Sequence, residues 1–145
     1  MNYRHTQIGY LMIYVLFALI LYFLFITTQI GLESAIIIVI FVTIFIVASF
    51  VALTVVIDDK YLRIKFGYGI FFKKFLLTEI ISVEIVKNHW YCGWGVRFCL
   101  RPRMWIFNVS GFDAVEIVMS GEKKYRIGTD EPQSLADAIT QVIRK

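Results

Sequence analysis

Two long apolar runs near the start of this 145-residue chain restrict what it can fold into. Residues 8–26 and 35–57 contain no Asp, Glu, Lys or Arg. A bilayer core requires about 20 helical residues, and neither run alternates as the strands of a membrane barrel do. We therefore predict two transmembrane helices, at about 8–26 and 35–57. The alternative of two buried core helices is disfavoured because the remaining chain is too short to cover both.

The connection between the two runs is short, so we expect an antiparallel helical hairpin with both chain termini on one side of the membrane. Lys and Arg flank the hairpin at Arg4 and from Lys60 onward, and the connection 27–34 has neither. Basic flanks stay in the cytoplasm. The sequence thus predicts a multi-pass protein of the inner (plasma) membrane with cytoplasmic termini. A cleaved signal peptide is the alternative for the first run, but that run is longer than usual and lacks a small-x-small cleavage pattern.

Charge divides the chain into an N-terminal tail with two helices, 1–57, and a cytoplasmic domain, 58–145. Hydrophobic residues make up 59% of the chain and its formal net charge is +4, yet Glu33 is the one charged residue within 8–57. Beyond residue 58, apolar and polar residues alternate with a period of two, which is typical of half-buried strands. We expect seven antiparallel strands, around residues 61–66, 71–76, 81–86, 96–100, 105–109, 114–119 and 123–128.

The last stretch changes to helical spacing. Thr129–Pro132 combines a capping side chain, acidic residues and an early Pro, which is a helix start signal. Leu135, Ile139 and Val142 then recur at helical intervals. The predicted fold class is a membrane α-helical hairpin plus an α+β domain, with a seven-stranded antiparallel barrel or sandwich capped by a C-terminal helix.

This layout resembles a pleckstrin-homology-like (PH-like) domain behind a two-helix hairpin. The chain is similar to small uncharacterised bacterial membrane proteins of that layout in three segments, Tyr91–Arg97, Trp105–Ile117 and Arg126–Pro132. The resemblance implies a fold and a membrane location, and it implies no settled activity.

Motifs that carry chemistry are scarce. The glycines at 67, 69, 93 and 95 are turn glycines, not a phosphate-binding fingerprint. His89, Cys92 and Cys99 supply three possible metal ligands, whereas a closed zinc site takes four. Cys92 with His89 as its base is a conceivable nucleophile, so an enzyme or a redox or metal sensor built on that pair stays open as an alternative. We predict no catalytic residue, no cofactor and no metal.

One constellation remains, an aromatic and basic segment that holds all three Trp residues of the chain. Its candidate interaction residues are Trp90, Tyr91, Trp94, Arg97, Arg101, Arg103 and Trp105. They suit a protein interface, anionic lipid headgroups, or simply the core and turns of the domain; nucleic acid is not expected. The functional prediction is a membrane-anchored, non-enzymatic scaffold or accessory protein with a protein partner or a homo-oligomer. An anionic-lipid-binding module is a further alternative.

Overall fold

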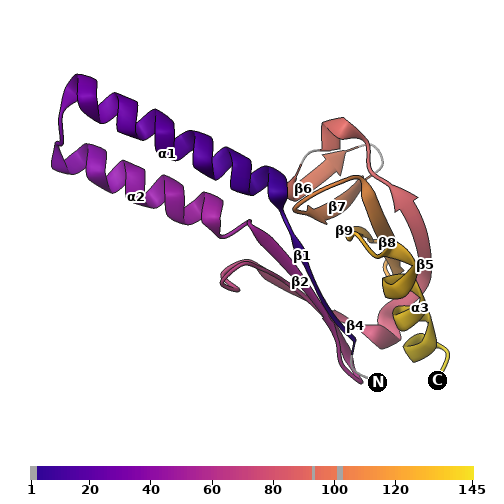
Figure 1. Cartoon of the computed structure of the whole chain (residues 1–145). Coiled ribbons are helices and arrows are strands. Elements are labelled where there is room, and N and C mark those ends of the chain that lie inside the picture. The colour runs from indigo at the N-terminus through magenta and orange to yellow at the C-terminus, as the bar shows by residue number, and fades with distance from the viewer. Residues whose placement is uncertain (1–2, 93, 101–102) are drawn as a thin grey trace.

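The computed structural model describes residues 3–92, 94–100 and 103–145. In these residues the chain forms two long helices that project from an α+β domain of two sheets and one further helix (Figure 1). The α+β class expected from the sequence is confirmed. The number of strands is not, because the described residues form nine strands where seven were expected.

The two additional strands come from segments that the sequence assigned elsewhere. The first sheet is antiparallel and has the order β1-β2-β3-β4. Its strands are β1 (Tyr3–Ile8), β2 (Ala52–Ile57), β3 (Tyr61–Phe66) and β4 (Phe72–Leu76). Strand β1 lies in the expected N-terminal tail, and β2 occupies the expected end of the second helix. The domain therefore includes residues on both sides of the helices, not 58–145 alone.

The second apolar run divides because its last part packs as a strand. Helix α2 (Ser34–Ala48) ends before Ser49, whose hydroxyl donates to the Ile46 carbonyl at 2.6 Å. Beyond it, Leu53, Val55 and Ile57 alternate into the domain core and are almost completely buried. β-branched residues favour a pleated, half-buried strand. Hydropathy alone does not distinguish such a buried strand from a continued helix.

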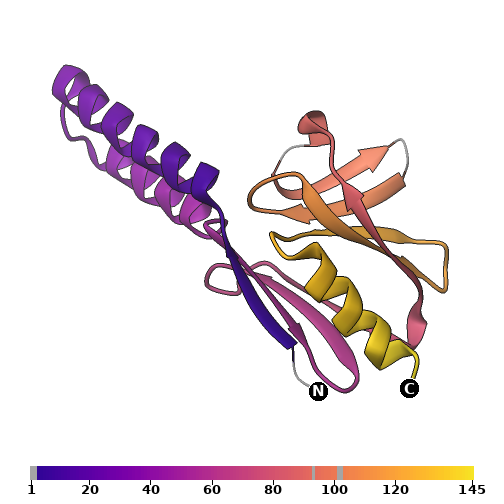
Figure 2. The same ribbon diagram turned by 45° about the vertical axis from the view of Figure 1, so that its right-hand side comes forward.

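Helix α1 (Tyr10–Ile30) and α2 lie side by side and point away from the sheets (Figure 2). Neither has a buried residue. By length and composition, α1 is the one helix in the described chain that is long and apolar enough to cross a membrane. Helix α2 has 15 residues, fewer than the roughly 20 that a bilayer core requires.

The second sheet has the order β5-β8-β9-β7-β6, in which β7 and β9 are parallel and the other pairs antiparallel. Its strands are β5 (Ile80–Lys87), β6 (Gly95–Leu100), β7 (Arg103–Asn108), β8 (Asp113–Met119) and β9 (Lys124–Gly128). Two short 3-10 turns, Leu77–Glu79 and Trp90–Cys92, flank β5. Strand β6 lies at one edge of this sheet, and β5 at the other.

The predicted C-terminal helix is confirmed as α3 (Pro132–Ile143), with Pro132 in its first turn. Leu135 and Ile139 are fully buried and belong to one core with the inner faces of both sheets. Helix α3 packs against β5 and β8. It closes one side of the space between the sheets, and the side between β4 and β6 carries no helix (Figure 2).

Candidate functional site

The end of the domain nearest to α1 and α2 is called the helix-proximal end here. Short connections hold the two helices close to this end. The Gly9 N–H, between β1 and α1, donates a hydrogen bond to the Val51 carbonyl, just before β2, at 2.6 Å. Three loop segments lie at this end in both views, namely 67–71, 88–92 and 109–112 (Figures 1 and 2). The helices and these three loops therefore share one end of the molecule.

The β3–β4 loop is packed against the base of α2. The ring of Tyr68 stacks on Phe45 with centroids 5.6 Å apart, and Phe71 stacks on Phe50 at 4.9 Å. The Gly67 N–H also donates to the Ala52 carbonyl at 2.8 Å. These contacts hold the loop next to the helix.

Large apolar side chains on all three loops are exposed. Trp90 and Tyr91 have 77% and 63% of their surface accessible. Tyr68 and Ile70 on the β3–β4 loop and Phe112 on the β7–β8 loop are exposed as well. The helix-proximal end thus carries an aromatic surface, defined as Tyr68, Ile70, Trp90, Tyr91 and Phe112.

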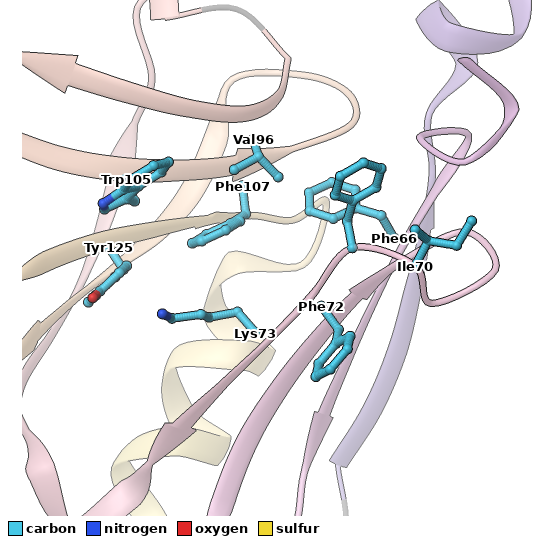
Figure 3. Close-up of a pocket in the computed structure, with 9 residues that line it drawn as sticks. Phe66, Ile70, Phe72, Lys73, Val96, Trp105, Phe107 and Tyr125 are labelled. Atoms are coloured by element: carbon cyan, nitrogen blue, oxygen red, sulfur yellow. The ribbon is translucent and has the colours of Figure 1, made fainter. Parts of the chain in front are cut away.

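An open pocket of about 290 Å³ lies between the two sheets on the side that α3 leaves uncovered. Figure 3 shows residues of β3, β4 and their loop on one side of it, and residues of β6, β7 and β9 on the other. Its lining is Phe66, Ile70, Phe71, Phe72, Lys73, Val96, Trp105, Phe107 and Tyr125. Ligand pockets are typically apolar clefts with a few polar groups, of about 300–1,000 Å³.

Lys73 is the one charged residue among those lining residues. It pairs with the core residue Ile64 across β3 and β4, so it faces the second sheet, whereas Lys74 faces away. Its amine lies 5.9 Å from the centre of the Tyr125 ring. In the described residues, ion pairs join His5, Arg63 and Arg126 to carboxylates, and Lys73 forms none.

A cationic face covers the outside of the first sheet. The strand registers place Arg4, Arg63 and Lys74 in one row, and Lys65 two residues from Arg63 on the same face. They border a shallow depression of about 300 Å³. Among these four cations, Arg63 is paired with Asp58 at 2.6 Å.

The candidate interaction residues of the sequence do not form a single surface. Trp90 and Tyr91 belong to the aromatic surface, while Trp94 is half-buried, with its indole 6.4 Å from the Phe112 ring. Arg97 pairs across β6 and β7 with Ile106, so it lies on the face opposite Trp105.

Trp105, by contrast, lines the pocket and contacts the Phe98 ring at 5.1 Å. Arg103 is exposed and lies on the same face of β7 as Trp105. Arg101 lies outside the described residues.

The pair proposed for nucleophile and base is described only in part. The His89 ring stacks on Tyr91 with centroids 5.0 Å apart, and the side chain of Cys92 lies outside the described residues. Cys99 is half-buried against Met104 and Ile106 on β7. No group of three potential metal ligands occurs in the searched part of the chain, 3–92, 94–100 and 103–145.

A polar cluster that the sequence did not indicate lies on the outer face of the second sheet. Arg126 donates from Nε to the Glu116 carboxylate at 2.8 Å and from an Nη to the Asn88 side-chain oxygen at 3.3 Å. Both charged side chains are nearly buried. The register that places Arg126 opposite Glu116 could have been found only once the β8–β9 pairing was known.

The comparisons with known proteins give no relative: no protein-family model and no curated protein matches the chain.

Proposed function

We propose that this chain is a membrane-anchored, non-enzymatic scaffold that holds its α+β domain against the bilayer surface. In this proposal α1 and α2 form a hairpin in the inner membrane, both termini are cytoplasmic, and the domain is PH-like. The observation that carries the proposal is the aromatic surface at the helix-proximal end, where three loops expose Trp90, Tyr91, Phe112 and their neighbours next to the helices.

Tyr and Trp are enriched at membrane–water interfaces because one end of each side chain is apolar and the other polar. Three separate loops define a plane, so their joint contact with lipid would fix the tilt of the domain as well as its distance from the bilayer. The linkers support this arrangement, since one residue, Gly9, joins β1 to α1 and three residues join α2 to β2. A domain on such short linkers cannot move far from the membrane.

The partner proposed for the scaffold is a protein with an extended apolar segment. Strand β6 is a sheet edge, and its Phe98 and Leu100 are 47% and 74% exposed. An edge strand can add an extended peptide through main-chain hydrogen bonds, while neighbouring pockets accept alternate side chains. We expect Leu100→Asp to abolish partner co-purification while the chain stays in the membrane fraction; Thr78→Asp, at an exposed position after β4, is the control.

The depth of Trp90 tests the proposed seat on the bilayer. A full-length variant with Trp94→Phe and Trp105→Phe keeps Trp90 alone. In vesicles of neutral brominated phosphatidylcholine, its fluorescence should be quenched most by bromine close to the headgroups. The matched variant that retains only Trp105 should be quenched much less. Trp90 accessible to acrylamide and insensitive to bromolipid would contradict the proposal.

A second candidate function is an anionic-lipid-binding module, which the cationic face of the first sheet favours. Each Lys or Arg near an anionic surface is worth about 1 kcal/mol, and this attraction decays within a Debye length of about 8 Å. Arg4→Gln with Lys65→Gln should then weaken binding of soluble inositol phosphate or anionic headgroup analogues, and added salt should do the same. Unchanged binding in the double variant excludes this module.

The enzyme or sensor alternative is tested by one substitution. Cys92→Ser in a folded and normally abundant protein should leave the cellular phenotype intact under the scaffold proposal. Complete loss of function in that variant would favour chemistry at His89 and Cys92.

A further inference from the structure

We infer that the pocket between the sheets is a binding site for one chain of an anionic amphiphile, with the chain among the aromatic residues and the anionic group on Lys73. This inference deepens the proposed function and rests on it in one respect, the position of the domain on the bilayer. The ligand class is a single acyl chain that ends in a carboxylate or phosphate.

The lining defines the apolar part of the ligand. Eight of the nine lining residues are aromatic or aliphatic, and they come from both sheets. Core packing holds several of these side chains in place. Phe66 is buried, and its ring centroid lies 6.4 Å from that of Phe107. The Phe107 and Tyr125 rings stack with their centroids 6.3 Å apart. The pocket walls are therefore preformed, and the volume of about 290 Å³ suits one chain better than two.

Lys73 defines the polar part. Its side chain points into the pocket from β4, toward Tyr125 (Figure 3). No carboxylate in the described chain forms an ion pair with it. Arg63, on the outer face of the same sheet opposite Lys74, is by contrast paired with Asp58. A lone ammonium beside an apolar lining is complementary to an anionic group on an apolar chain.

The polarity of the pocket matches that of a lipid in the facing leaflet. Ile70 and Phe71 line the pocket on the loop that packs on α2, and Lys73 lies further along β4, away from the helices. The apolar end of the pocket thus opens toward the bilayer, and the Lys73 ammonium lies farther from the bilayer than that end. A lipid in that leaflet has its headgroup toward the domain and its chain toward the bilayer. It could reach Lys73 with its anionic group while its chain follows the apolar wall.

Lys73 and Lys74 provide a matched pair for the experiment, because adjacent strand residues point to opposite faces. The probe is stearate brominated in mid-chain, added to the full chain in nanodiscs of neutral phosphatidylcholine. The reporter is Trp105 in a variant with Trp90→Phe and Trp94→Phe. We expect saturable quenching by the acid. Lys73→Gln should weaken the apparent affinity about tenfold, equal to about 1.4 kcal/mol, and Lys74→Gln by less than about twofold.

Two further arms define the ligand. The methyl ester of the same brominated chain has no charge and should bind about as weakly to the unmodified chain as the acid binds to the Lys73→Gln variant. An anionic lysophospholipid with the brominated chain tests the phosphate source, and Lys73-dependent saturation with either anionic probe supports the site. Val96→Phe, which fills the pocket without touching a charge, should abolish saturation with both.

Equal affinity of the Lys73→Gln and Lys74→Gln variants, or equal binding of acid and ester, would overturn the inference. The result is separable from the depth of Trp90. A water-exposed Trp90 together with Lys73-dependent binding would refute the seat on the bilayer and retain the pocket. An interfacial Trp90 with no saturable quenching of Trp105 would do the reverse.

Discussion

His5 on β1 donates a hydrogen bond from Nε2 to the carboxylate of Asp130, 125 residues later in the chain, at 2.5 Å. The other ring nitrogen, Nδ1, lies 3.6 Å from the Glu131 carboxylate. His5 belongs to the edge strand of the first sheet, and the two acidic residues immediately precede α3. This contact joins the strand before α1 to the start of the C-terminal helix, across the side of the domain that α3 closes.

The first prediction is that this contact is energetically coupled. Asp130 is more than half exposed, and exposed ion pairs contribute about 0.2–1 kcal/mol. In a double-mutant cycle of His5→Ala and Asp130→Asn, the interaction between the two side chains should therefore stabilise the folded state by about 0.5 kcal/mol. Urea unfolding of the full chain in detergent measures it. The pair His5→Ala and Gln133→Ala is the control, and additive effects in the Asp130 cycle would contradict the prediction.

The sequence was sufficient for the elements whose periodicity is local. Leu135 and Ile139 recur at helical spacing and form the buried face of α3. Alternation likewise located β3, which has one face in the core and one outside it. It also located β5 and β8, although Ile81 and Ile85 on β5 are exposed and residues 114–117 on β8 are buried on both faces. These patterns require only that neighbouring positions have opposite environments.

The sequence was insufficient where the pairing of strands that are distant in the chain determines the structure. The apolar pattern at Thr54, Val55 and Val56 is typical of the end of a membrane helix. These residues belong instead to β2, because β1 and β3 pair with it on both sides. The pocket was missed for the same reason. Lys73 and Trp105 lie in different sheets, and no local spacing brings them together.

The second prediction concerns the turn that follows β3. Gly67 has a φ of +43°, and a Cβ at this position would lie 2.5 Å from the Ser49 carbonyl oxygen. Gly67→Ala should lower the free energy of unfolding by about 2 kcal/mol or more, because a left-handed conformation and a backbone clash both oppose it.

Gly111→Ala is the matched control for Gly67→Ala. Its φ is +70°, but no atom lies within 4 Å of an added Cβ, so it carries the conformational cost without the clash. It should cost about 1 kcal/mol. Equal losses in the two variants, measured by urea unfolding in detergent, would show that Ser49 does not restrict position 67.

The third prediction addresses the buried pair of Glu116 and Arg126. Arg126→Met leaves the Glu116 carboxylate nearly buried without its charged partner, which should destabilise the domain by about 3 kcal/mol. The double variant Glu116→Met with Arg126→Met should recover most of this loss, since it removes both charges. Thermal unfolding followed by near-UV circular dichroism provides the measurement.

The surface pair of Arg63 and Asp58 is the control for the buried pair. Arg63 is about half exposed, so Arg63→Met should cost less than about 1 kcal/mol. A loss at Arg63 that equals the loss at Arg126 would mean that burial does not determine the strength of these pairs.

The fourth prediction is a loss of stability at alkaline pH through Tyr3. Burial, with the Glu131 and Asp130 carboxylates nearby, raises the pKa of Tyr3 from 10.0 to about 12. A raised pKa means that the folded state favours the neutral phenol. The stabilisation is thus complete below the unfolded pKa of 10.0, and it is lost as pH rises from there toward about 12.

Tyr3→Phe should remove this alkaline loss and keep stability at neutral pH, because the hydroxyl is buried without a hydrogen-bond partner in the described residues. Glu131→Gln, which lowers the pKa of Tyr3, should weaken the same dependence. Unfolding free energies measured from neutral to alkaline pH test both variants, and parallel pH profiles for Tyr3→Phe and the unmodified chain would exclude Tyr3 as the group responsible.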